Sequence, residues 1–141
     1  EKRILELVES EAKATHSLAV EMLSQQELFQ IRQDILNLYM SEDTKTYLVE
    51  LVMATRHAEK YNPELASAIE YGVSPRATTA LSRAARALAW LNGQTFVTPA
   101  EVQAVVHDVF RHRLLLSFEA EATGKTVDAI IDELIARVPV I

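Results

Sequence analysis

Helix-start signals recur along the whole chain, and they constrain its fold more than any other feature. Each is a serine or threonine suited to cap a helix, and apolar residues follow it at spacings of three and four. The signals are Ser24-Gln-Gln-Glu27, Ser41-Glu-Asp43, Ser74-Pro75, Thr98-Pro-Ala-Glu101 and Thr126. Only three glycines and four prolines interrupt the 141 residues. The pattern predicts an all-α fold, a compact helical bundle of about six helices.

The spacing of apolar residues predicts which face of each helix points into the core. The first covers residues 1–14, with an extension to 23 left open, and the others begin at the start signals. The predicted inward faces are Ile4, Leu5, Val8 and Ala12; Leu28, Ile31, Ile35 and Leu38; Tyr47, Leu48, Leu51, Val52 and Thr55; and Ile130, Ile131, Leu134 and Ile135. The link 58–73 has room for a short helix over Pro63–Glu70. For residues 113–121, strand and helix both remain open.

Charge and composition exclude several classes of protein. The net charge is −6, so the surface as a whole repels nucleic acid and anionic membranes. The chain has no cysteine, hence no thiolate metal site, which fits a cytoplasmic protein. No apolar run approaches the roughly 20 residues of a membrane span. The start at Glu1, without methionine, suggests an excised fragment, and the ending "VPVI" suggests the natural C-terminus.

The segment "EAEATGKT" resembles the end of a phosphate-binding P-loop but lacks its other elements. Gly124-Lys125-Thr126 precedes a predicted helix, yet Glu119 stands where the loop needs another glycine. Glu119 and Glu121 would also repel phosphate. We therefore predict that Gly124 ends one element and Thr126 caps the next.

No other cluster in the sequence has the spacing of a catalytic or metal site. His107 and His112 are five residues apart, so a helix turns them away from each other. His16 and His57 have no partner at ligand spacing, and no serine or threonine has the motif of a catalytic triad. The sequence predicts no metal site.

The helix that begins "SPRATTALSRAARALAWL" carries the most informative pattern. Ser74 and Pro75 read as its cap and first residue, which puts Arg76 in the first turn. A cation there opposes the helix dipole at a cost of about 0.3–1 kcal/mol. A guanidinium at a helix start can, however, bind an oxyanion together with free backbone amides. From the residues alone, an oxyanion site and a solvated arginine both remain open.

The same helix has two predicted faces. At 100° per residue, one side gathers an apolar stripe of Ala77, Leu81, Ala84, Leu88 and Leu91. The opposite side gathers Arg76, Thr79, Arg83, Arg86 and Trp90. For Arg83 and Arg86 an ordinary solvated basic face is the favoured interpretation.

From about Leu65 to the end, the sequence resembles the C-terminal lid domain of MoxR-type AAA+ ATPases. The resemblance rests on Gly-x-Ser-Pro-Arg-Ala (72–77), "TPAEV" (98–102), "RHR" (111–113) and the closing "VP". Residues 22–58, including "LVMATR", match more loosely. The magnesium-chelatase ATPase subunit has a related lid, but the segment after "RHR" favours the MoxR side.

The resemblance implies a single AAA+ lid domain over residues 1–141, with residues 1–23 as a candidate connection from a missing ATPase core. Arg76 then falls on the sensor-2 position, which reaches the γ-phosphate of ATP, with Ser74 and Pro75 beside it. Whether it acts on its own subunit's ATP or on a neighbour's remains open. The fragment is expected to hold no cofactor and to be inactive alone, whereas the full-length protein is expected to bind ATP with Mg²⁺ and hydrolyse it.

The resemblance also implies partners. These are the chain's own AAA+ core, neighbouring subunits of a ring homo-oligomer and a von Willebrand A-domain client, in a chaperone-like role. Neither nucleic acid nor membrane insertion is expected. The alternative is a stand-alone helical dimerisation or scaffold module, because the helices joined by "NGQTFVTPAEV" resemble a histone-fold pair.

Overall fold

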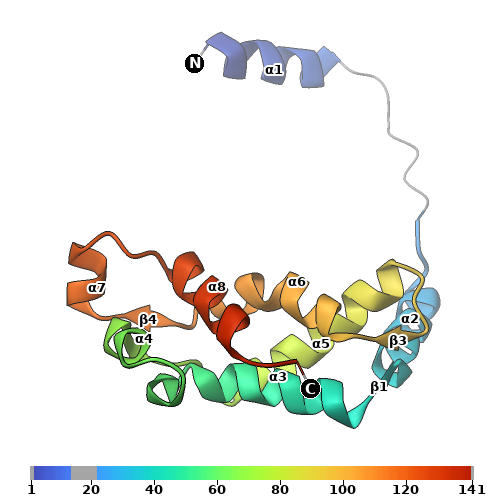
Figure 1. The fold of residues 1–141 in the computed structure, drawn as a ribbon. Coiled ribbons are helices and arrows are strands. Elements are labelled where there is room, and N and C mark those ends of the chain that lie inside the picture. Colours follow the sequence, from blue (N-terminus) through green and yellow to red (C-terminus); the bar gives the residue numbers. More distant parts are fainter. Residues whose placement is uncertain (1, 14–21, 141) are drawn as a thin grey trace. The chain divides into compact units, whose positions relative to one another are not determined.

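The computed structural model describes residues 2–13 and 22–140, and these are mostly helical (Figure 1). In chain order the elements are α1 (Lys2–Lys13), α2 (Gln25–Asn37), β1 (Tyr39–Met40), α3 (Glu42–Ala54), η1 (Ala58–Lys60, a 3-10 helix), α4 (Pro63–Ala68), β2 (Ile69–Tyr71), α5 (Arg76–Leu91), β3 (Phe96–Val97), α6 (Pro99–Phe110), β4 (Leu115–Leu116), α7 (Phe118–Ala122) and α8 (Val127–Arg137). The all-α prediction is confirmed, with eight α-helices in the described ranges instead of about six.

The chain divides into two compact units, Glu1–Ile31 and Arg32–Ile141, and the second holds the core. In the first unit, Ile4, Leu5 and Val8 of α1 are exposed. The predicted extension of this helix to residue 23, and the side chain of Ala12, lie outside the described residues.

Most of the predicted helix starts are confirmed by their hydrogen bonds. The Glu27 amide donates to Ser24 Oγ and the Ser24 amide donates to Glu27 Oε2, which closes a capping box at α2. Ser41 and Thr126 accept backbone amides at the starts of α3 and α8. A second capping box, from Thr98 to Glu101, begins α6.

Glu101 is buried within its capping box. Its carboxylate accepts hydrogen bonds from the amide and the hydroxyl of Thr98. Burial acts to raise the pKa of Glu101, but the hydrogen bonds outweigh it and hold the pKa below its ordinary value. The hydrogen-bonding groups of the capping box at the start of α6 therefore have their partners within the chain.

The core lies between α3, α5, α6 and α8, and α5 packs most extensively against α6. Along α5 the buried residues are Ala77, Leu81, Ala85 and Ala89, one turn apart. The predicted stripe is right for the first two and wrong at its far end: Ala84 and Leu88 are half-buried and Leu91 is 72% exposed. The alanines let α6 approach closely, whereas Leu91 is the last residue of the helix.

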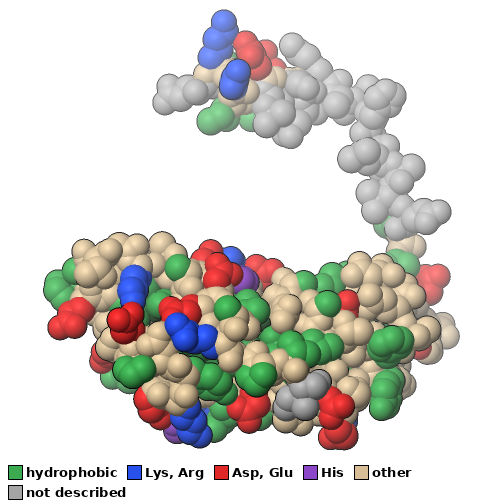
Figure 2. All heavy atoms as spheres, in the orientation of Figure 1, with side chains coloured by type: hydrophobic (Ala, Val, Ile, Leu, Met, Phe, Trp, Pro, Cys, Tyr) green, Lys and Arg blue, Asp and Glu red, His purple; other side chains and the backbone are tan. Residues whose placement is uncertain are grey.

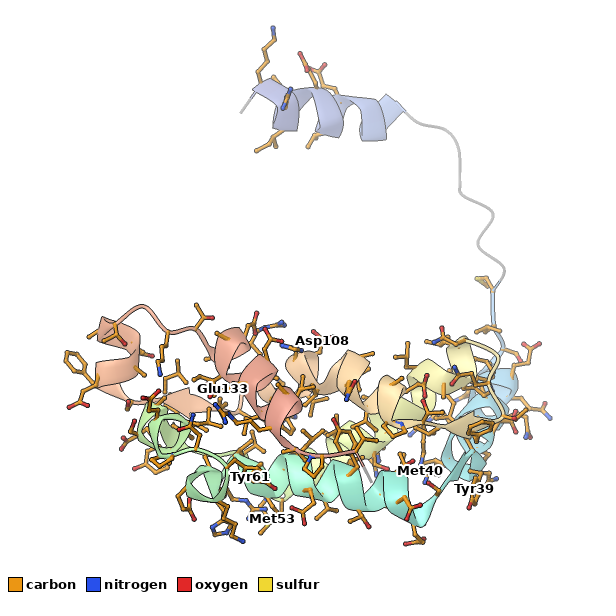
Figure 3. All side chains as sticks on the ribbon, in the orientation of Figure 1. Tyr39, Met40, Met53, Tyr61, Asp108 and Glu133 are labelled. Atoms are coloured by element: carbon orange, nitrogen blue, oxygen red, sulfur yellow. The ribbon has the colours of Figure 1, made fainter. Side chains whose placement is uncertain are left out.

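The predicted inward faces of α3 and α8 are largely confirmed. In α3, Tyr47, Leu48, Leu51 and Val52 are buried, as is Thr55 just after it. In α8, Ile130, Ile131 and Leu134 are buried, and Ile135 is half-buried. Asn62 caps α4 and also donates to Glu133 of α8, which is labelled in Figure 3.

Two short sheets join segments that are far apart in the sequence. β1 pairs with β3 in parallel, with Met40 opposite Val97, both buried; Tyr39 precedes Met40 on β1 and is exposed (Figure 3). β2 pairs with β4 antiparallel, with Tyr71 opposite Leu115. Residues 113–121, left open above, contain both a strand and the start of a helix.

The end of α2 is held by an arginine of α5. Arg86 donates to the carbonyl oxygen of Leu38, just beyond the last residue of α2. None of the residues of α2 is buried; Ile31, Ile35 and Leu38 are intermediate, and Leu28 is exposed. The predicted face of α2 is therefore only half covered, and Arg86 has a structural contact where a solvated side chain was predicted.

Candidate functional site

The segment before α5 is fixed against the end of α3 by two features. A Cβ atom on Gly72 would lie 2.4 Å from the Thr55 carbonyl oxygen, so only glycine fits there. The Val73 amide donates to Thr55 Oγ1 at 3.0 Å, and this hydroxyl donates to the Val52 carbonyl at 2.7 Å. Val73 itself is fully buried. The backbone that leads to Arg76 therefore has a defined position.

Arg76 lies in the first turn of α5, as the sequence predicted, but the helix begins at Arg76 instead of Pro75, and Ser74 does not cap it. Pro75 already has helical dihedral angles, and no side chain caps this helix start. The amides of Ala77 and Thr78 donate to the carbonyl oxygens of Ser74 and Pro75 at 2.8 and 3.1 Å. Because Pro75 continues the helical conformation, these carbonyls take the place of the predicted hydroxyl cap.

This tight first turn also changes the expected donor set for an anion. Two amides that the sequence suggested for an oxyanion are already bonded within the turn. The guanidinium of Arg76 is thus the main donor, assisted by the positive end of the helix dipole. A planar guanidinium can hold two oxygens of one phosphate at once.

The three arginines of α5 have different surroundings. Arg76 and Arg83 are exposed, and within the described part of the chain neither forms a hydrogen bond or an ion pair. Arg86 is half-buried and bonded to Leu38. Arg76 and Arg83 therefore carry uncompensated charges, whereas Arg86 has a hydrogen-bond partner.

A groove of about 280 Å³ adjoins the segment before Arg76. Its lining includes Gly72, one cation, Arg56, and two carboxylates, Glu59 and Glu70. The negative charges outnumber the positive one, so the groove disfavours a phosphate. Arg76 is therefore the stronger candidate ligand for an oxyanion at this end of α5.

The AAA lid domain family matches residues 64–134, which include Gly72, Val73 and Arg76 but not Thr55. The chain belongs to the AAA lid domain family, in its MoxR-type branch. This finding confirms the resemblance drawn from the Gly-x-Ser-Pro-Arg-Ala motif.

Several relatives support the assignment of the lid. Chaperone MoxR1 of Mycobacterium tuberculosis is 32% identical over 121 residues, which cover 85% of this chain and 32% of the relative. Protein MoxR of Paracoccus denitrificans is 38% identical over 108 residues, covering 72% and 32%. The crystal structure of a proposed ATPase from Cytophaga hutchinsonii matches with a TM-score of 0.88 and 33% identity, covering 100% of the lid chain and 43% of that chain. The lid chain thus spans about a third of the length of these curated relatives.

The P-loop-like segment of the lid is a helix connection, as predicted. Gly124 has a φ of +80°. The amides of Gly124 and Lys125 donate back to the carbonyls of Glu121 and Ala120 at 2.9 and 3.0 Å, which ends α7. Thr126 then caps α8.

The histidines of the lid do not gather into a site. His107 Nε2 lies 3.0 Å from Asp132 Oδ1, and His57 Nδ1 lies 3.4 Å from Glu59 Oε1, so these two histidines face carboxylates and not each other. His16 lies outside the described residues. In the ranges 2–13 and 22–140 no group of three or more His, Asp or Glu side chains is placed to hold a metal ion. In the same ranges no helix is long and apolar enough to cross a membrane.

Thr55 is the positioning residue that sequence reasoning missed. It was predicted to face inward, and it is buried, but its hydrogen bond to Val73 joins positions 18 residues apart. A hydroxyl on an otherwise apolar helix face was the only signal available.

Proposed function

We propose that this lid couples ATP binding and hydrolysis in an AAA+ core to conformational change and ring assembly, with Arg76 as the sensor-2 residue. In this role the guanidinium of Arg76 contacts the γ-phosphate of ATP held by the core, and Ser74 and Pro75 border the contact. The proposal includes a chaperone-like role and a von Willebrand A-domain client.

The observation that carries the proposal is the exposed guanidinium of Arg76 at an uncapped helix start. A cation is unfavourable at that position unless an anion joins it. The described residues supply no such anion to Arg76. A phosphate bound to another domain fits both the charge and the geometry of a planar fork.

The restrained backbone before Arg76 supports a catalytic contribution as well as binding. Donors that are already aimed at developing negative charge stabilise a transition state without reorganisation. Gly72 and the bond from Val73 to Thr55 restrain the backbone before Arg76. Mg²⁺ would accompany the ATP and be held by the core, while the lid contributes the guanidinium.

The test is ATP hydrolysis by the full-length protein carrying Arg76→Ala. We expect the rate to fall about 100-fold or more, the size of effect seen when one preorganised donor is removed. Arg76→Lys should recover only part of the rate, because an ammonium cannot bind two oxygens side by side. Neither variant should unfold at a lower temperature than the wild type.

Lys60→Ala is the matched control for this experiment. It removes one exposed positive charge, from η1, and within the described segments Lys60 has no ion pair. Its rate of ATP hydrolysis should equal that of the wild type. Wild-type turnover by Arg76→Ala would refute the sensor-2 assignment.

The stand-alone dimerisation module is the competing function, and the family match favours the lid. The two differ in what precedes Glu1 in the parent gene. An ATPase core with a P-loop there supports the lid, and a gene without one would support the dimerisation module.

A further inference from the structure

A second groove, of about 270 Å³, lies between the C-terminal half of α2 and the middle of α5. Its apolar lining is Ile35, Leu36 and Ala87, and Leu36 is 51% exposed. Arg32 of α2 and Arg83 of α5 line the same groove from its two helices. Among the described residues neither guanidinium has a hydrogen-bond or ion-pair partner. The groove therefore suits an apolar side chain that has carboxylates on both sides.

The short helix α7 presents that chemistry. Phe118, its first residue, is 85% exposed, and Glu119 and Glu121 are also exposed. At 100° per residue the two glutamates fall on either side of Phe118. Lys125 shares a depression with Glu119, but in the described part of the chain neither glutamate forms an ion pair. Figure 2 shows hydrophobic and acidic side chains next to one another at the end of the unit Arg32–Ile141 where α7 lies.

The start of α7 is hydrogen-bonded to the end of α4 although Phe118 is exposed. The Ser117 amide donates to the Ala68 carbonyl at 2.9 Å, and Ser117 Oγ accepts the Ala120 amide at 3.3 Å. Ala120, within α7, is buried. A preorganised segment loses little conformational entropy when it binds.

The groove and α7 lie at opposite ends of the unit Arg32–Ile141 (Figure 1). One copy therefore cannot place its own Phe118 in its own groove. Two copies can pair head to tail, and this kind of contact closes into a ring when its rotation permits.

We propose that the groove between α2 and α5 binds α7 of a second copy of this chain. Phe118 would lie against Ile35, Leu36 and Ala87, while Glu119 and Glu121 pair with Arg32 and Arg83. The inference rests on the ring assembly proposed above and names the surfaces that form it. The contact is small, so it acts together with the contacts of the cores in the full-length ring.

The test exchanges charges in the full-length protein and measures oligomer mass against concentration by sedimentation velocity. One variant carries Arg32→Glu and Arg83→Glu, and another carries Glu119→Arg and Glu121→Arg. Each should raise the concentration of half-assembly at least about tenfold, because like charges then face each other. The variant with all four substitutions should return to within about threefold of the wild type.

The design contains its own control for net charge. The first pair makes the chain four units more negative and the second makes it four units more positive, so a shared loss cannot come from net charge. Phe118→Ser should weaken assembly without changing any charge. All five side chains are exposed, and unchanged thermal unfolding will show that the fold is kept.

Three outcomes would overturn the interface. These are wild-type assembly by both double variants, loss of assembly only in the arginine variant, and failure of the fourfold variant to reassemble. The sensor-2 role is tested independently of this interface. The full-length protein with Arg76→Ala should assemble like the wild type while losing ATP hydrolysis. If the wild-type full-length protein stays monomeric with ATP, ring assembly and this interface are both wrong.

Discussion

The starts of α5 and α6 are a natural pair to compare, because the two helices pack on each other and each start contains a hydroxyl residue followed by a proline. At α6, Thr98 and Glu101 satisfy each other within the helix start. At α5, no side chain caps the helix, and Arg76 adds a positive charge to its positive end.

The difference shows that similar helix-start motifs can have different roles, one in stability and the other in binding. The start of α6 contributes to the stability of the lid alone. The start of α5 leaves the positive charge of Arg76 uncompensated in the described part of the lid. An anion bound to another domain would compensate this charge. The following predictions test whether the two starts differ in this way.

The largest effect on stability should come from Gly72→Ala, just before the start of α5. The added Cβ would lie 2.4 Å from the Thr55 carbonyl oxygen and 2.7 Å from its carbon, both backbone atoms. Overpacking of this kind costs about 1–3 kcal/mol. The melting temperature should fall by roughly 3–10 °C, and ATP hydrolysis by the full-length protein should fall too. Gly93→Asn is the control: a Cβ there meets no atom within 4 Å, and Asn tolerates the φ of +69°.

Removing each hydroxyl residue compares the two helix starts directly. Thr98→Ala should lower the free energy of unfolding by about 1 kcal/mol, because it removes half of a capping box. Ser74→Ala should change it by less than about 0.5 kcal/mol, since Ser74 contributes only its carbonyl. Urea unfolding of the two variants measures the difference, and equal losses would contradict it.

A small effect of the opposite sign should come from Arg76→Glu. An acidic residue in the first turn suits the dipole, so the lid should gain about 0.3–1 kcal/mol of stability. Urea unfolding at low ionic strength should detect the gain, and about 1 M salt should remove most of it. The same substitution should abolish ATP hydrolysis in the full-length protein. A loss of stability would show that Arg76 serves the fold of the lid.

Prediction from the sequence succeeded where one helix face carries large apolar residues. Tyr47, Leu51 and Ile131 stand at unambiguous spacings, and all three are buried. It was less accurate on α5, where small residues dominate and a helical wheel cannot tell which alanines face a neighbour. Packing against α6 buried Ala85 and Ala89 and left Leu91 exposed.

For the candidate site, the sequence predicted the position of Arg76 but not its surroundings. A proline fixes where a helix can begin, so the first turn could be read locally. The contacts of Arg86 with Leu38 and of Thr55 with Val73 join residues 48 and 18 positions apart. Contacts of that range depend on tertiary packing, which local spacing does not encode.

The close approach at Gly72 also has a mechanical consequence. The chain from β2 to α5 lies directly on the last turn of α3, with a buried valine and a hydrogen bond to Thr55 as fixed points. A connection built this way has little slack, because close-packed atoms transmit strain. A displacement of Arg76 would therefore be transmitted to the end of α3 through the contacts of Gly72 and Val73 with Thr55. The four-residue segment from Gly72 to Pro75 would act as a short, stiff connection.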